Sequence, residues 1–229
     1  MAADWRDFSV PDWGVKRVDL WRFLDCCPMS MPEFGRAVNC EAERGGEGLK
    51  VLVGYSMGGR LALHALLEGG PWDAAVLIAP HPGLESEGER PARRASDAEW
   101  GSMALSGEWP SFLERWEGQG VLKRTPNSEW QMADRRLLAA RRREVARSFI
   151  DWSLGAQESL WGRLQEIRCP VLWCAGEADP KFSALAERAV GLMPDAALWL
   201  APGAGHRVPW DAPEAFRAKI GEFLERVGS

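Results

Sequence analysis

A serine flanked by glycines joins an apolar run to a helical pattern in the first third of the chain. Residues 54–58 read Gly-Tyr-Ser-Met-Gly; a Val-Leu-Val run precedes them, and apolar residues recur at helical spacing over residues 61–66. A strand that turns sharply into a helix needs small residues on both sides of the turn, so Gly54 and Gly58 are both expected to be required. The turn would place Ser56 at a helix N-terminus, where free backbone N–H groups favour developing negative charge. The segment therefore predicts a nucleophile elbow centred on Ser56.

Apolar runs and helical patterns alternate along much of the chain. Strands are predicted at residues 15–19, 51–53, 74–79, 170–175 and 196–201, and helices at residues 32–44, 61–66, 183–192 and 213–227. Such alternation is typical of an α/β fold with a mostly parallel sheet and helices on both faces.

Residues 83–165 break this alternation, because their apolar residues recur only at helical spacing among many charges. We predict a helical insertion there, within a core formed by residues 1–82 and 166–229. Residues 90–147 carry twelve Lys and Arg against eight Asp and Glu, although the whole chain has a formal net charge of −5. Most of these charges are expected on solvated helix faces. Some of the arginines are expected to meet an anionic ligand, since guanidinium pairs bidentately with carboxylate.

A serine hydroxyl needs an imidazole to take its proton and a carboxylate to hold that imidazole. His206 lies in a glycine-rich loop after a predicted strand, and Glu177 and Asp179 follow the preceding predicted strand. Asp179 is favoured as the acid because its shorter side chain, just before Pro180, can be fixed rigidly. The sequence therefore predicts Ser56, Asp179 and His206 as a catalytic triad.

The other two histidines have weaker claims to the site. His64 falls within the helix after the elbow and is expected to be a packed or surface residue. His81 follows the predicted strand at residues 74–79, at the sheet edge where ligands bind in such folds, and is a candidate pocket residue.

Composition excludes several other classes of protein. No apolar stretch reaches the ~18 residues of a membrane span, and the N-terminus lacks a basic region followed by an apolar segment, so a cytoplasmic location is predicted. The negative net charge argues against nucleic-acid binding. Five cysteines without Cys-x-x-Cys spacing predict neither a disulfide framework nor a metal site. No cofactor is expected, and the chain is compatible with a monomer or a homo-oligomer.

The serine elbow, the histidine loop and the insertion together resemble the α/β-hydrolase fold, with residues 83–165 in the position of that family's cap. Within the fold, the chain resembles the 2-succinyl-6-hydroxy-2,4-cyclohexadiene-1-carboxylate synthases of menaquinone biosynthesis. The segments that carry this resemblance are residues 54–60, 81–84, 112–116, 159–161, 176–182 and 202–206.

This resemblance implies a lyase that eliminates pyruvate from a cyclohexene polycarboxylate, with the serine acting as a base. It implies an oxyanion donor at Met57 and substrate-binding roles for Tyr55, Arg60, His81, Arg94, Trp116 and Arg147. Two alternatives stay open: a serine carboxylesterase or carbon–carbon bond hydrolase that uses the same triad, and a non-catalytic binding protein with a degenerate site.

The chain departs from the family near its start. The family begins with strands that end in a His-Gly loop, whose backbone N–H contributes to the oxyanion hole. No such segment precedes residues 15–19, which match the next family strand. Either the chain is a shortened variant or its start has been placed too late. In a shortened variant, loss of one oxyanion donor would cost about 3 kcal/mol in a hydrolase.

Overall fold

The chain divides into two compact units. One, which we call the helical unit, combines Met1–Ser30 with Ser86–Gln157; the other, the sheet unit, combines Met31–Glu85 with Glu158–Ser229. Residues 1–30, expected to form part of the core, lie in the first of these units. The computed structural model describes residues 2–11, 13–122, 125 and 127–228.

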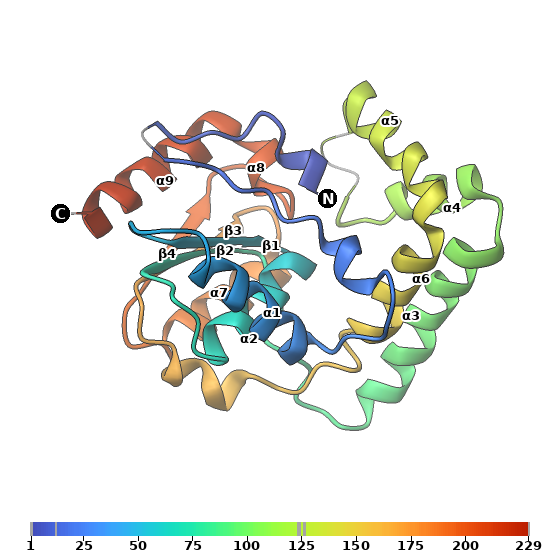
Figure 1. Cartoon of the computed structure of the whole chain (residues 1–229), viewed down its shortest axis with the longest axis horizontal. Coiled ribbons are helices and arrows are strands. Elements are labelled where there is room, and N and C mark those ends of the chain that lie inside the picture. The colour runs from blue at the N-terminus through green and yellow to red at the C-terminus, as the bar shows by residue number, and fades with distance from the viewer. Residues whose placement is uncertain (1, 12, 123–124, 126, 229) are drawn as a thin grey trace. The chain divides into compact units, whose positions relative to one another are not determined.

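A four-stranded parallel sheet, in the order β1-β2-β3-β4, lies within the sheet unit (Figure 1). The strands are β1 (Val51–Tyr55), β2 (Ala74–Ile78), β3 (Val171–Gly176) and β4 (Ala196–Ala201). Every residue of β2 and β3 is buried. Because successive side chains of a strand point to opposite faces, both faces of these two strands must be covered. The predicted α/β class with a parallel sheet is therefore confirmed.

Helices of the sheet unit begin and end close to the predicted positions. They are α1 (Met31–Glu43), α2 (Met57–Leu67), α7 (Pro180–Val190), α8 (Val208–Asp211) and α9 (Pro213–Gly228), with a 3-10 turn η4 (Trp161–Glu166). Helix α7 begins three residues earlier than predicted because Asp179 caps it and Pro180 occupies its first position. Helices α1 and α2 pack closely, since a Cβ on Gly35 would meet the backbone nitrogen of Ala65 at 2.9 Å.

The helical unit contains helices α3 (Glu89–Ser106), α4 (Trp109–Glu117), α5 (Glu129–Leu137) and α6 (Arg142–Asp151), and 3-10 turns η1 (Ala2–Trp5), η2 (Leu20–Leu24) and η3 (Leu138–Arg141). Helices α3 and α6 pack along each other, and η2 packs on α6 (Figure 1). Their core is aromatic, with Trp100, Phe112 and Phe149 in mutual contact. No helix among the described residues has both the length and the apolar character needed to cross a membrane.

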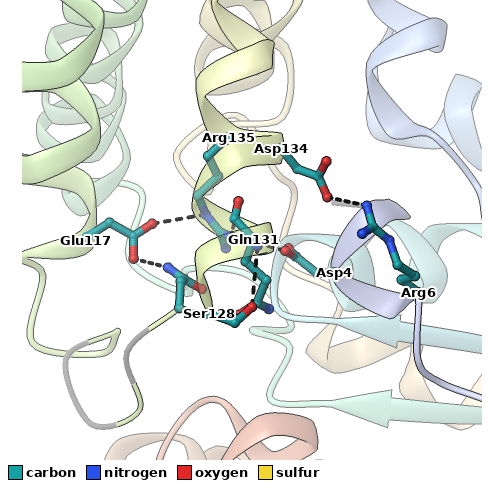
Figure 2. A network of polar contacts seen from close by, with 8 residues as sticks. Asp4, Arg6, Glu117, Ser128, Gln131, Asp134 and Arg135 are labelled. Atoms are coloured by element: carbon teal, nitrogen blue, oxygen red, sulfur yellow. Dashed lines mark hydrogen bonds and ion pairs between the residues drawn. The ribbon is translucent and has the colours of Figure 1, made fainter.

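A polar network ties the N-terminal segment to α5 within the helical unit (Figure 2). The Arg135 guanidinium lies between two carboxylates, 3.1 Å from Asp4 and 3.0 Å from Glu117. Arg6 pairs with Asp134 on the same helix at 2.9 Å. These contacts explain why residues at the start of the chain group with the helical unit.

The predicted strand at residues 15–19 is wrong. This segment forms no strand, and the described N-terminal residues contain only an isolated bridge between Val10 and Trp13. Arg17 instead donates hydrogen bonds to the carbonyls of Trp5, Arg6 and Phe8, and Asp19 caps η2. The polar side chains of the segment thus bind local backbone, which a short apolar pattern does not reveal.

Candidate active site

Ser56 occupies a strained turn between β1 and α2. Its φ of 50° lies in the left-handed region, which is rare for a residue other than glycine and is typical of functional turns. Its backbone nitrogen donates to Ile78 on the neighbouring strand at 2.8 Å, and its carbonyl accepts from Arg60 at 3.0 Å. The turn is therefore fixed from the sheet side and from the helix side.

Only one of the two flanking glycines is required by packing. A Cβ on Gly54 would meet the Gly58 carbonyl oxygen at 2.6 Å and the Gly59 Cα at 2.8 Å. A Cβ on Gly58 would meet nothing within 4 Å, whereas one on Gly59 would meet Pro80 at 3.0 Å. The expectation for Gly58 was wrong, because the helix approaches the strand through Gly59 instead.

Three side chains from separate loops meet at the carboxyl edge of the sheet. His206 Nε2 lies 3.0 Å from Ser56 Oγ, and His206 Nδ1 lies 3.0 Å from Asp179 Oδ2. The side chains of His206 and Asp179 are only 5% and 11% exposed, so their interaction is little screened by water. With the ring proton on Nδ1, the Nδ1–H donates a hydrogen bond to the Asp179 carboxylate, and Nε2 is free to accept the serine proton. The arrangement is chemically able to deprotonate Ser56.

The two acidic candidates of the preceding loop have different partners. Asp179 Oδ2 faces the imidazole, while its Oδ1 accepts from the Phe182 nitrogen at 3.3 Å and so caps α7. Glu177 Oε2 accepts from the Gly203 nitrogen at 3.0 Å instead. The cap fixes the Asp179 rotamer, which matches the physical reason for which the sequence favoured it.

The acid loop and the histidine loop pass each other at close range. A Cβ on Gly176 would come within 2.4 Å of the Ala204 carbonyl oxygen. The Ala178 nitrogen donates to that same oxygen at 2.8 Å. This contact holds the two loops in register at the carboxyl ends of β3 and β4.

Aromatic rings surround the imidazole. The ring centroid of His206 lies 4.3 Å from that of Phe182 and 5.5 Å from that of Tyr55. The ring centroid of His81 lies 6.5 Å from that of Phe182, and the His81 Nδ1 accepts a hydrogen bond from the Gly83 nitrogen. Of the predicted site residues, Tyr55 thus contacts the His206 ring directly, and His81 is separated from that ring by Phe182.

Met57 and Arg60 lie in the first turn of α2. Met57 is the first helical residue, a position whose N–H has no intrahelical acceptor. Arg60 is buried rather than exposed, and its Nη1 lies 4.0 Å from Met31 Sδ on α1. One turn further, burial lowers the pKa of His64 to about 4, with the Arg60 charge as the next cause. His64 is therefore a neutral core residue at physiological pH.

The remaining predicted site residues belong to the helical unit and have partners there. Trp116 packs edge-on against Trp100, with centroids 5.3 Å apart. Arg94 donates to the Gly155 carbonyl at 2.9 Å, and Arg147 donates to the Leu24 carbonyl at 2.7 Å. Tyr55 and His81 thus belong to the same unit as Ser56 and His206. Arg94, Trp116 and Arg147 belong to the helical unit.

Sequence reasoning missed two residues beside the site. Trp210 packs against Tyr55 with centroids 5.1 Å apart, and Asp211 accepts a hydrogen bond from the Gly205 nitrogen. Their only signal was their position four and five residues after His206. Among the described residues, no group of three or more His, Cys, Asp or Glu side chains is arranged to hold a metal ion.

Known proteins share this fold. The model of the alpha/beta hydrolase family matches residues 3–219. The structure of MenH from S. aureus superposes with a TM-score of 0.81, at 24% identity, over 96% of this chain and 81% of that one. This likeness extends the fold assignment over nearly the whole chain.

Curated relatives agree with the family. The 2-succinyl-6-hydroxy-2,4-cyclohexadiene-1-carboxylate synthase of Pectobacterium atrosepticum is 30% identical over 76% of this chain and 67% of its own. A Bacillus subtilis relative that carries the same name provisionally is 33% identical over 77% of this chain. The match spans 66% of that relative's length. The chain belongs to the alpha/beta hydrolase family, and within it is similar to these synthases.

Proposed function

We propose that the protein is a lyase of menaquinone biosynthesis that eliminates pyruvate from a cyclohexene polycarboxylate. The observation that carries this proposal is the pair of 3.0 Å contacts linking Ser56, His206 and Asp179. Similarity to curated synthases of this name supports the choice of reaction.

In the proposed reaction Ser56 acts as a base. Its Oγ gives a proton to His206 Nε2 and takes one from a ring carbon of the substrate. The electron pair left on the ring forms a new double bond, and the bond between a ring carbon and the oxygen of the pyruvate group breaks. The departing pyruvate enolate takes up the proton that His206 received from Ser56, which returns the imidazole to its neutral form. Asp179 stabilises the imidazolium that forms meanwhile, because its carboxylate is in contact with Nδ1.

The substrate would be held by aromatic and basic groups. Tyr55 and His81 lie beside the reacting pair and would contact the ring, and the Met57 N–H would stabilise developing negative charge. Arg60, Arg94, Arg147 and Trp116 remain our candidates for binding the substrate, the arginines through its carboxylates. Arg60 would act mainly through its charge, since its guanidinium contacts Met31.

Ester or carbon–carbon bond hydrolysis is the competing proposal. It would use the same three residues with Ser56 as a nucleophile, and the elbow geometry favours it equally. Ester hydrolysis depends strongly on its oxyanion donors, since removal of one lowers kcat by about 10²- to 10³-fold, and the Ser56 nitrogen is already bonded to the Ile78 carbonyl. A proton abstraction depends less on such a second donor, which favours the lyase.

The test measures pyruvate release from the cyclohexene precursor, coupled to lactate dehydrogenase, beside hydrolysis of p-nitrophenyl acetate. We expect pyruvate release that Ser56→Ala lowers by at least about 10³-fold. Ester turnover that disappears in Ser56→Ala, with no pyruvate from the precursor, would reject the lyase in favour of the hydrolase. Failure of both reactions would reject catalysis by this site.

A further inference from the structure

Side chains outside the three proposed catalytic residues hold the loop that carries His206. The Gly203 nitrogen donates to Glu177, and the Gly205 nitrogen donates to Asp211 Oδ2 at 2.7 Å. Glu177 is exposed, whereas the bond to Asp211 is partly buried. Gly205 immediately precedes His206, so any displacement of this bond moves the imidazole directly.

Asp211 is held in an unfavourable environment. Its Oδ1 is inaccessible to solvent and has no hydrogen-bond partner among the described residues. A buried carboxylate oxygen without a partner destabilises a fold, so each such group in a native structure requires an explanation. The 2.7 Å bond from the Gly205 nitrogen supplies one, because the acceptor oxygen of Asp211 has to lie in this position to hold the loop.

The short helix α8 contacts the residue that precedes Ser56 and the residue that precedes His206. The backbone nitrogens of Trp210 and Asp211 both donate to the Arg207 carbonyl at 2.8 Å, which fixes the two side chains relative to each other. Trp210 packs on Tyr55, the residue before Ser56, and Asp211 binds the residue before His206. One helical turn thus sets the position of the serine turn and of the histidine loop.

From this juxtaposition we infer that Asp211 is a positioning residue, which acts through the Gly205 N–H to keep the His206 imidazole in line with Ser56 Oγ. This inference rests on the proposed use of Ser56 and His206 as a proton-transfer pair. It does not depend on which substrate the protein takes.

The test compares Asp211→Ala with Asp211→Asn by the rate at which a fluorophosphonate probe labels Ser56. The alanine removes the acceptor, and a misplaced imidazole is expected to slow labelling about 10- to 100-fold. The asparagine keeps an acceptor oxygen and is expected to label within about threefold of the unmodified protein. Glu214→Ala is the matched control, since it removes an exposed carboxylate of α9 that pairs only with Arg217 among the ion pairs described.

Pyruvate release supplies a second readout, in which we expect Asp211→Ala to lower kcat with little change in KM. Labelling of Asp211→Ala at the unmodified rate, or equal slowing in a folded Asp211→Asn, would overturn the inference. Circular dichroism monitors folding of each variant. If Asp211→Ala does not fold, Asp211→Ser replaces it, because the serine side chain is one bond shorter and its hydroxyl does not reach the Gly205 nitrogen. The same slowing of labelling is expected for Asp211→Ser. If the unmodified protein reacts with the probe at Ser56 but releases no pyruvate, the proposed lyase activity is contradicted. The comparison of labelling rates among the Asp211 variants still tests the role of Asp211.

Discussion

Two glycines beside Ser56 look equivalent in the sequence but have different surroundings. We expect Gly54→Ala to lower the free energy of unfolding by about 1–3 kcal/mol, because its Cβ would collide with backbone atoms that cannot move separately. Gly58 is helical, lacks a positive φ and has open space at its Cβ. Gly58→Ala is therefore expected to raise the free energy of unfolding by about 0.4–1 kcal/mol. Urea denaturation of both variants measures these changes, and equal destabilisation would contradict the packing argument.

Asp179 and Glu177 offer a second comparison between residues of one loop. Asp179→Asn is expected to lower kcat about 10⁴-fold, because the amide no longer favours the Nδ1-protonated tautomer. Glu177→Gln keeps an acceptor for Gly203 and is expected to lower kcat by less than about threefold. Steady-state kinetics of pyruvate release, or labelling rates at Ser56, distinguish the two. A large loss in Glu177→Gln with a small one in Asp179→Asn would exchange the assigned roles.

At the scale of elements, Arg135 of α5 forms an ion pair with Asp4 of η1. Arg135 is 14% exposed and neutralises Asp4 and Glu117, which are 8% and 21% exposed (Figure 2). Its removal takes the arginine charge away from two shielded carboxylates, so Arg135→Ala is expected to lower the free energy of unfolding by about 3 kcal/mol. Arg6→Ala breaks the more exposed pair with Asp134 and is expected to lower it by less than about 1 kcal/mol.

Hydrogen exchange locates the effect of these two variants. Faster amide exchange in α5 is expected for Arg135→Ala and little change for Arg6→Ala. The reason is that Arg135 links α5 to two other segments, through its ion pairs with Asp4 and Glu117. Equal exchange in both variants would show that burial of the Arg135 pairs has no consequence for the stability of this helix.

At the scale of the whole molecule, local patterns predicted the elements whose signal is local. The runs at residues 74–79, 170–175 and 196–201 are apolar and bounded by turn residues, and each forms a strand with bounds within one residue. Parallel strands carry their loops to one edge, so the loop order alone brought Ser56, Asp179 and His206 together.

What the sequence did not predict depends on contacts between distant segments. Arg17 fails to pair in a strand because it binds carbonyls of the N-terminal segment, and Arg135 recruits Asp4 to the helical unit. The role we infer for Asp211 likewise exists only once α8 folds back on the histidine loop. No short-range sequence pattern predicts these contacts, since each joins a polar side chain to a partner that only the folded chain brings close.

The stability of the whole molecule is expected to depend on pH through His64. Burial and the Arg60 charge lower its pKa to about 4, Arg163 adds to this, and Glu68 opposes it. An unfolded histidine has a pKa near 6.5, so between about pH 6.5 and pH 4 the unfolded chain binds a proton that the folded protein does not. The free energy of unfolding therefore falls with decreasing pH across this window, by up to about 3 kcal/mol from His64 alone.

His64→Leu isolates this contribution. The His64 Nε2 atom is buried without a hydrogen-bond partner among the described residues, so an apolar side chain of similar size leaves no orphaned donor or acceptor. Urea denaturation of both proteins at pH 7, 6, 5 and 4.5 should show a shallower loss of stability in the variant, because the carboxylates common to both proteins cancel in the comparison. Parallel curves for the two proteins would mean that His64 gains no proton on unfolding, and that its burial does not set the acid sensitivity of the fold.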